Sequence, residues 1–407
     1  MKYGREWQRR MHEMSQIDPG TPTWLRAHND RTAFRLLLEH GPLTRARLGK
    51  LSGMSKPTAA QMLARLERVG LIAPVGEVSA GRGPNAVTYG VRTDRITGVA
   101  ISILEHSIHA VVVDAVDADH PIVEVVRDAA DRSPQNDVRA AVLAACDAAG
   151  ISEASVSRVV VGVQAAVFVE GDELSFTDTL PGWPESGARQ QIEAALDLDV
   201  TLDNDVNLAA MAERSAGVAQ DASSFALLWM GGGLGVGLDV GGIVLRGAHG
   251  GAGELGYLAV PRAALEFEPD ANDLTDLLGG PAVLRLLGGS ESQPLADVLV
   301  GLPENPAALA ALADRIVLAV EPLLAVLDPA LIVLGGPTGS AGGEALAELV
   351  NARMDASARP KLSIRTSGTG RQPVLLGARQ KLVEQIHAEL EDEISAVTDP
   401  QRWSVEA

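Results

Sequence analysis

The chain has 407 residues, 46% of them apolar and 21% charged, a length and composition that suggest two or three globular domains with sizeable cores. Its single cysteine, Cys146, excludes an internal disulfide and a zinc site built from thiolates. The sequence contains no apolar stretch typical of a signal peptide or a membrane span, so we expect a cytoplasmic protein that does not bind membranes.

The net charge of −19 is unevenly distributed along the chain. Residues 1–95 hold 16 Lys and Arg against 8 Asp and Glu, which gives a charge of +8. The remaining residues hold 18 Lys and Arg against 45 Asp and Glu, which gives −27. Because phosphates attract cations, only the N-terminal part is expected to approach nucleic acid.

The basic part begins with two predicted helices. Helical spacing of apolar residues predicts the first over about Asp30–Glu39, ended by a Gly–Pro pair. The second follows Thr44, a good N-cap, and stops at Gly53.

A third helix is predicted after Ser55, a second good N-cap, with Pro57 tolerated in its first turn. It ends at Gly70. Its apolar positions form one predicted buried stripe: Ala59, Met62, Leu63, Leu66 and Val69. Its other face is polar and basic: Lys56, Thr58, Gln61 and Arg65.

Two short helices around a glycine turn, the second with a basic free face, are typical of a helix-turn-helix. The two short strands predicted after it, with Arg82 between glycines at their tip, indicate a wing. We expect Gln61 and Arg65 to read bases, and Lys56 and Arg82 to contact the backbone or minor groove. The full predicted DNA-binding set is Arg45, Ser55, Lys56, Pro57, Thr58, Gln61, Arg65 and Arg82. The alternative is a helical dimerisation module with a solvated basic face.

Strand–helix alternation from Ile96 onward predicts an α/β body with two lobes and a cleft between them. The predicted strands lie in these segments: 96–104, 107–116, 156–169, 199–204, 224–247 and 330–336. The predicted helices are these: 134–149, 206–217, 307–327 and 375–393. The domain prediction is a winged helix-turn-helix over 24–92 and a two-lobed body over 96–393.

Six motifs occur in order along the body: TLPGW (179–183), DNDVNLAA (203–210), GGGLGVGL (231–238), RGAHGGAGELGYL (246–258), LDPALIVLGGP (327–337) and LLGARQ (375–380). With them, residues 96–390 resemble the ROK family of sugar kinases and sugar-responsive repressors. The resemblance implies the actin-like, ribonuclease H-like ATPase fold. Together with the winged head, it extends over nearly the whole chain.

The resemblance also implies a sugar site. Asn204 and Asp205 would bind sugar hydroxyls, the aspartate being the base in the kinases, and Glu254 would reach the same sugar. We also assign Gly182 and Tyr257 to this ligand site. From the residues alone, Asp205 could instead be a helix N-cap, Glu254 a solvated loop carboxylate and Tyr257 a buried core residue.

The chain departs from the family pattern in three places. The strand that carries an Asp and a Gly-Gly-Thr phosphate turn in the kinases reads GVAISILEH, with Ala100 at the carboxylate position, and Gly232 replaces the usual Thr of GGGLG. Tyr257 stands where the family has a zinc-binding His, and 258–290 contains no cysteine. Gln164–Ala165–Ala166 replaces a Pro–Gly turn that lies beside the sugar. We therefore expect neither phosphoryl transfer nor zinc.

These observations predict a transcriptional regulator, a repressor of carbohydrate-related genes, that is not an enzyme and needs no cofactor or metal. Its partners would be a palindromic DNA operator, a sugar or sugar derivative, and a second copy of the chain. Two alternatives stay open. One is an active sugar kinase with an added DNA-binding head, and the other is a DNA-binding scaffold that responds to no ligand.

Overall fold

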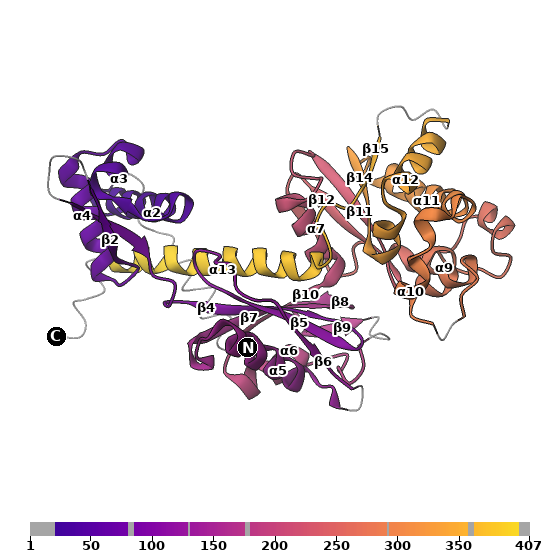
Figure 1. Cartoon of the computed structure of the whole chain (residues 1–407), viewed down its shortest axis with the longest axis horizontal. Coiled ribbons are helices and arrows are strands. Elements are labelled where there is room, and N and C mark those ends of the chain that lie inside the picture. Colours follow the sequence, from indigo (N-terminus) through magenta and orange to yellow (C-terminus); the bar gives the residue numbers. More distant parts are fainter. Residues whose placement is uncertain are drawn as a thin grey trace.

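The computed structural model describes residues 21–79, 85–128, 131–175, 180–290, 293–356 and 362–398. Figure 1 shows a small N-terminal head, a first lobe and a second lobe, with the long helix α13 extending between the head and the body. Within the described residues, no helix is both long and apolar enough to cross a membrane.

The head is a winged helix, α2-β1-α3-α4-β2-β3, with a three-stranded sheet in the order β1-β3-β2. Its elements have these bounds: α2 Pro22–His40, β1 Leu43–Thr44, α3 Arg45–Ser52, α4 Lys56–Arg68, β2 Ile72–Val78 and β3 Ala86–Val91. The predicted caps of its helices are present. Thr44 and Ser55 accept hydrogen bonds from the backbone amides of Arg47 and Thr58, and Gly53 ends α3 in the left-handed conformation.

Two expectations for the head need correction. Helix α2 begins at Pro22, well before the predicted start at Asp30, because Thr21 is an N-cap and Pro22 fits the first turn. The sequence upstream of Asp30 has little apolar periodicity, so it gave no signal. Val69 is only half-buried, whereas the other four residues of the α4 stripe are buried.

Arg65 does not lie on the free face of α4. Its guanidinium forms two hydrogen bonds to the carboxylate of Asp30 on α2, at 2.7 and 2.6 Å. Asp30 is 2% exposed, and burial raises its pKa despite the nearby Arg65. In this conformation the Arg65 guanidinium neutralises a buried carboxylate. Base reading by Arg65 therefore stays a prediction, and it would require this ion pair to open.

The first lobe is a five-stranded sheet in the order β10-β7-β4-β5-β6. Its elements are β4 Thr97–Ile103, β5 Ser107–Val113, β6 Val123–Val126, α5 Pro134–Ala149, β7 Val156–Val163, α6 Ala188–Leu196 and β10 Asp199–Asn204. Helices α5 and α6 cover one face of the sheet and α13 covers the other (Figure 1). The short strands β8 Ala166–Phe168 and β9 Glu173–Ser175 pair with each other beside it.

The second lobe contains a five-stranded sheet in the order β13-β12-β11-β14-β15. Its strands are β11 Ser224–Met230, β12 Leu234–Val240, β13 Ile243–Leu245, β14 Leu331–Gly335 and β15 Ser363–Thr366. Its helices are α7 Asp205–Ala216, α8 Thr275–Leu278, α9 Gly280–Leu286, α10 Leu295–Leu299, α11 Pro306–Val326 and α12 Gly336–Ala356. The described residues of the body also contain these short 3-10 helices: η2 Glu153–Ser155, η3 Leu255–Tyr257, η4 Arg262–Glu266 and η5 Leu302–Glu304.

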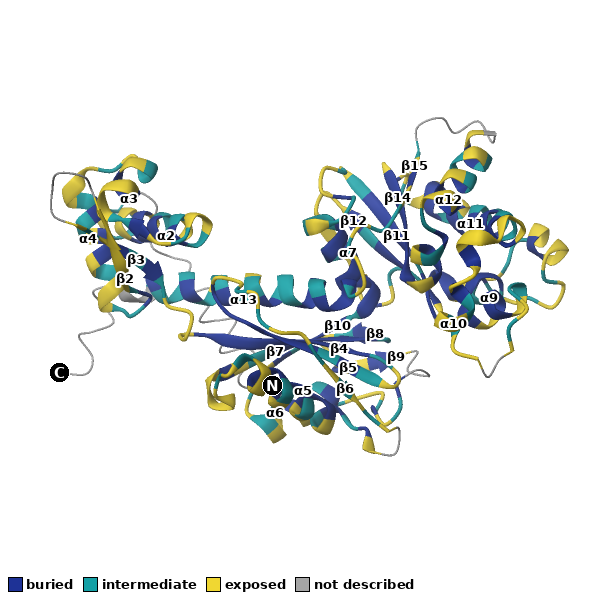
Figure 2. Cartoon of the chain, viewed as in Figure 1, coloured by how far each residue is buried: buried dark blue, intermediate teal, exposed yellow. Residues whose placement is uncertain are grey.

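Helix α13, Pro373–Thr398, joins all three parts of the molecule. It packs against α7, against β4, β5 and β7 of the first lobe, and against α2 of the head. Its buried residues recur at helical spacing and belong to one apolar core that also contains head residues: Leu375, Ala378, Leu382, Ile386, Leu390 and Ile394. Figure 2 shows that this helix is buried along the side facing the sheet.

Ion pairs fasten the far end of α13 to the head. Arg35 of α2 binds both carboxylate oxygens of Glu391, at 2.6 and 2.5 Å. Arg95, in the segment between head and first lobe, donates to Glu393 at 2.8 Å. The head is thus attached to the body through a helix as well as through the chain connection near Arg95.

We predict that Arg65→Ala lowers the free energy of unfolding by about 3–5 kcal/mol, because it leaves the buried Asp30 carboxylate without a counter-ion. Urea denaturation of the full chain measures this loss. The double variant Asp30→Leu/Arg65→Leu, which removes both charges, should be closer to the wild type than the single variant. If the double variant is the less stable of the two, the pair is not the source of the effect.

Candidate functional site

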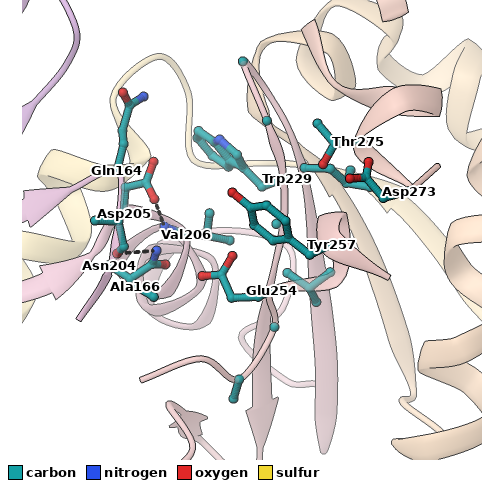
Figure 3. A pocket seen from close by; sticks show the side chains of 18 of the residues that line it. Gln164, Ala166, Asn204, Asp205, Val206, Trp229, Glu254, Tyr257, Asp273 and Thr275 are labelled. Carbon is teal, nitrogen blue, oxygen red and sulfur yellow. Dashed lines mark hydrogen bonds between the residues drawn. The ribbon is translucent and has the colours of Figure 1, made fainter. Parts of the chain in front are cut away.

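A cavity of about 380 Å³ lies between the two lobes, and we call it the interlobe cleft. Its first-lobe wall is formed by Gln164–Ala166 and by the end of β10. Its second-lobe wall contains Trp229, the Gly232–Gly233 turn and Glu254 (Figure 3). Three predicted ligand residues, Asn204, Asp205 and Glu254, therefore come together at one cavity, as does Tyr257.

The residue before them, Asp203, anchors the end of β10. It is 2% exposed and accepts hydrogen bonds from Arg246 of the second lobe, at 3.1 and 2.6 Å, and from Lys381 of α13, at 2.5 Å. Burial opposes ionisation of Asp203, but hydrogen bonds and charge from the two cations outweigh it and lower its pKa. We call these three residues the Asp203 cluster.

Asn204, not Asp205, is the N-cap of α7. Its side-chain oxygen accepts from the amide of Asn207 at 3.0 Å, and its side-chain nitrogen donates to the carbonyl of Ala165 at 3.0 Å. The cap alternative for Asp205 is therefore wrong. Asn204 lines the cleft, but both its polar atoms already hold the β7–β8 turn and the helix start in place.

Asp205 is the first residue of α7, and it is only 7% exposed. One carboxylate oxygen accepts from the amide of Val206 at 2.9 Å. Burial raises the pKa of Asp205 to about 7, and the charge of Glu254 adds to the effect. Burial also raises the pKa of Glu254. Two carboxyl groups whose pKa values are raised by burial thus face one cavity.

Two further predicted ligand residues lie differently. Tyr257 is 51% exposed at the cleft, so the alternative of a buried core tyrosine is wrong. Gly182 is not among the residues that line the cleft. Its φ is +76°, and a Cβ there would lie 2.3 Å from the carbonyl oxygen of Arg132. Gly182 is therefore needed for close backbone packing, and the prediction that it contacts a ligand is not supported by its position.

Sequence reasoning missed four cleft residues: Trp229, Asp273, Thr275 and Asp276. Trp229 lies near the end of β11, and the other three precede or begin α8. Asp273 and Asp276 hold a local turn, in which the amide of Asn272 donates to Asp276 at 2.8 Å. No motif marked this segment. Only the fold brings it opposite Asp205.

On the head, most of the predicted DNA-binding residues are accessible. Lys56, Pro57 and Gln61 are exposed on α4, and Arg45 is exposed at the start of α3. Ser55 and Thr58 are linked by a 2.8 Å hydrogen bond at the start of α4. Arg82 lies outside the described residues.

Arg47 and Lys50 are also exposed on α3, beside the buried Leu48, and sequence reasoning omitted them. The helical period of RARLGKLS would have indicated them. Within the ranges that the structure describes, no group of three or more His, Cys, Asp or Glu is arranged to hold a metal ion.

The raised pKa of Asp205 predicts a pH-dependent stability. Its folded pKa of about 7 exceeds the ordinary value of 3.8, so its contribution to stability is complete below that value and is lost as pH rises through 7. Asp205→Asn removes the buried charge. Relative to the wild type, the variant should therefore gain up to about 4 kcal/mol between about pH 4 and pH 8.

Thermal unfolding of both proteins across this pH range tests the prediction. Asp221→Asn, at an exposed position, is the matched control and should follow the wild type at every pH. A constant difference between Asp205→Asn and the wild type would mean that Asp205 does not titrate in this range.

Comparison with known structures places the fold. A ROK family transcriptional regulator, described as a homologue of the E. coli MLC protein, superposes with a TM-score of 0.64 at 19% identity, covering 92% of this chain and 98% of that chain. A ROK family glucokinase from Streptomyces griseus, solved with glucose and AMPPNP, superposes with a TM-score of 0.57 at 22% identity. The match covers 71% of this chain and 99% of the glucokinase chain. The regulator match thus covers more of this chain than the kinase match.

Sequence comparison gives relatives of both kinds. The xylose repressor of Bacillus subtilis is 18% identical over 248 residues, 60% of this chain and 63% of the repressor. The glucokinase of Halalkalibacterium halodurans is 33% identical over 101 residues, 25% of this chain and 31% of the kinase. The matches span less than two thirds of either relative. The ROK family model, however, matches residues 100–385, and the chain belongs to the ROK family.

Proposed function

We propose that the chain is a DNA-binding transcriptional regulator, with a repressor's mode of action, whose body senses a sugar in the interlobe cleft and transfers no phosphate. The observation that carries the proposal is the combination of a winged-helix head and an interlobe cleft in one ROK-family chain. It is supported by two relatives described as a xylose repressor and a transcriptional regulator.

The exposed face of the head favours DNA as its partner. Arg45, Arg47 and Lys50 on α3 and Lys56 on α4 supply cations on consecutive helices, and Gln61 supplies a side chain able to read an adenine edge. Recognition helices of this kind enter the major groove with their N-terminal residues. Two copies of the chain would bind half-sites about 34–36 Å apart.

The cleft favours a polyol over a nucleotide. Asp205, Glu254 and Tyr257 offer oxygen atoms that hydrogen-bond to neighbouring hydroxyls, and Trp229 offers an aromatic surface. The β4–β5 turn, which would bind phosphates in a kinase, provides no glycine amides. Its carbonyls at Leu104 and Glu105 accept from the buried Arg132, at 3.0 and 2.7 Å.

The Asp203 cluster would let a movement at the cleft be passed to the head. Lys381 holds α13 to the residue that precedes Asn204 and Asp205, and Arg246 holds the second lobe to the same carboxylate. A ligand that draws the lobes together would move α13 along the first lobe. Because Glu391 at the other end of α13 is paired with Arg35 of α2, the head would move with it.

The head assignment predicts two different effects of substitution. Lys56→Ala should weaken binding to all duplexes alike and reduce the slope of log affinity against log salt by about 0.9, because one phosphate contact is lost. Gln61→Ala should cost about 1–3 kcal/mol at one position of the preferred site and relax its specificity there. Binding to duplexes selected from a random pool measures both effects.

Arg262→Ala, which removes an exposed cation of the second lobe, is the control and should bind DNA as the wild type does. If Gln61→Ala retains the full binding profile over the random pool, Gln61 does not read bases. If Lys56→Ala and Arg262→Ala behave alike, α4 does not face the DNA.

If the cleft binds a sugar, Asp205→Ala should lower the affinity for that sugar at least about tenfold, since a hydrogen bond to a carboxylate is worth roughly 1.5–3 kcal/mol. Calorimetry of the wild type and variant with a sugar panel measures this change. A phosphate-release assay with the same sugars and Mg-ATP should show no turnover. Turnover by the wild type would establish a kinase, and equal affinity of both proteins would remove Asp205 from the site.

A further inference from the structure

The charge of the interlobe cleft restricts the chemistry of its ligand. Four carboxylates line it, those of Asp205, Glu254, Asp273 and Asp276, and none of its described lining residues is Lys, Arg or His. Arg246 and Lys381, which reach the end of β10, are engaged by Asp203 and do not line the cleft. The charged side chains that a ligand would meet in the described lining of the cleft are therefore all acidic.

Asp205 is the strongest indication that a ligand group binds here. Its side chain is 7% exposed, and one of its oxygens accepts from Val206. Among the described residues no side chain donates a hydrogen bond to its carboxylate, which faces the cleft that the residue lines (Figure 3). A carboxylate in a buried position is stabilised by hydrogen-bond donors, so a donor from a ligand in the cleft would stabilise Asp205.

The donor must also relieve the repulsion between Asp205 and Glu254. Burial and this repulsion disfavour two negative charges on the pair. A neutral sugar could be accepted if one carboxyl keeps a proton. An ammonium group would let both carboxylates ionise and would form charge-assisted hydrogen bonds with them. A phosphate group would add negative charge to a site without a cation.

We propose that the cleft binds an amine-bearing sugar, with its ammonium between Asp205 and Glu254, and rejects phosphorylated sugars. The proposal rests on the sugar-sensing function proposed above, and it names the class of sugar. Asp273 and Asp276 add to the selectivity, because they continue the negative second-lobe wall beyond Glu254.

The test compares matched sugars that differ in one group. Calorimetry on the full chain uses 2-amino-2-deoxy sugars of the gluco, galacto and manno series. For each, it also uses the N-acetyl derivative, the parent 2-hydroxy sugar and the 6-phosphate of the amino sugar. We expect at least one amino sugar to bind about tenfold more tightly than its acetylated and hydroxylated counterparts, and its 6-phosphate not to bind.

Two variants test the origin of the preference. Glu254→Gln keeps the shape of the side chain and removes its charge, so the preference for amine over hydroxyl should fall about tenfold. Glu304→Gln, at an exposed position outside the cleft, should leave it unchanged. An undiminished amine preference in Glu254→Gln would contradict the proposed position of the ammonium.

The measurements distinguish a wrong ligand class from a wrong regulator function. If a parent sugar or an N-acetyl sugar binds more tightly than its amine and alters DNA binding, the sensor stands and the amine proposal is wrong. Tight binding of a 6-phosphate also overturns the amine proposal alone. If no member of the panel binds at millimolar concentration, the amine proposal is overturned, while the DNA measurements above still test the regulator.

Discussion

The buried carboxylate of Asp203 joins the end of β10 to the second lobe and to α13. A carboxylate that is 2% exposed is tolerated only with compensating charge, and Arg246 and Lys381 supply it from two different parts of the chain. The cluster ties the last residues of β10 to the second lobe and to α13. Because Asn204 and Asp205 follow directly, the position of the candidate ligand site is set by the same interaction that holds the lobes and the C-terminal helix together.

Charge is divided between the two ends of the molecule. The head presents Arg45, Arg47, Lys50 and Lys56 on its exposed helices, while the charged side chains in the described lining of the cleft are all carboxylates. This division explains how a chain with a net charge of −19 can be proposed to bind DNA. It also explains why the cleft should discriminate among sugars by charge. Helix α13 spans the two ends, paired with Asp203 at one end and with Arg35 at the other.

Sequence patterns predicted most of the local structure. The boundaries of α5 and the caps Thr44 and Ser55 were read correctly, because they depend on neighbouring residues. The failures have long-range causes. The sequence pattern of α4 placed Arg65 on the exposed face, but Arg65 pairs with Asp30 of α2, which no pattern within α4 could predict. The cleft residues Trp229 and Asp273 carry no motif, and only the folded chain brings them to Asp205. Asp203 was read as part of a motif, with no sign of its two cationic partners.

The proposed regulation requires that a ligand in the cleft change DNA binding through α13. The most direct test is the DNA affinity of the full chain, with and without a saturating sugar identified by calorimetry, in the wild type and in Lys381→Met. Arg246 still neutralises Asp203 in the variant. We predict that the sugar changes the free energy of DNA binding by about 1–3 kcal/mol in the wild type. The variant should still bind the sugar and the DNA, but the sugar should change its DNA affinity much less. Equal coupling in the two proteins would contradict the account.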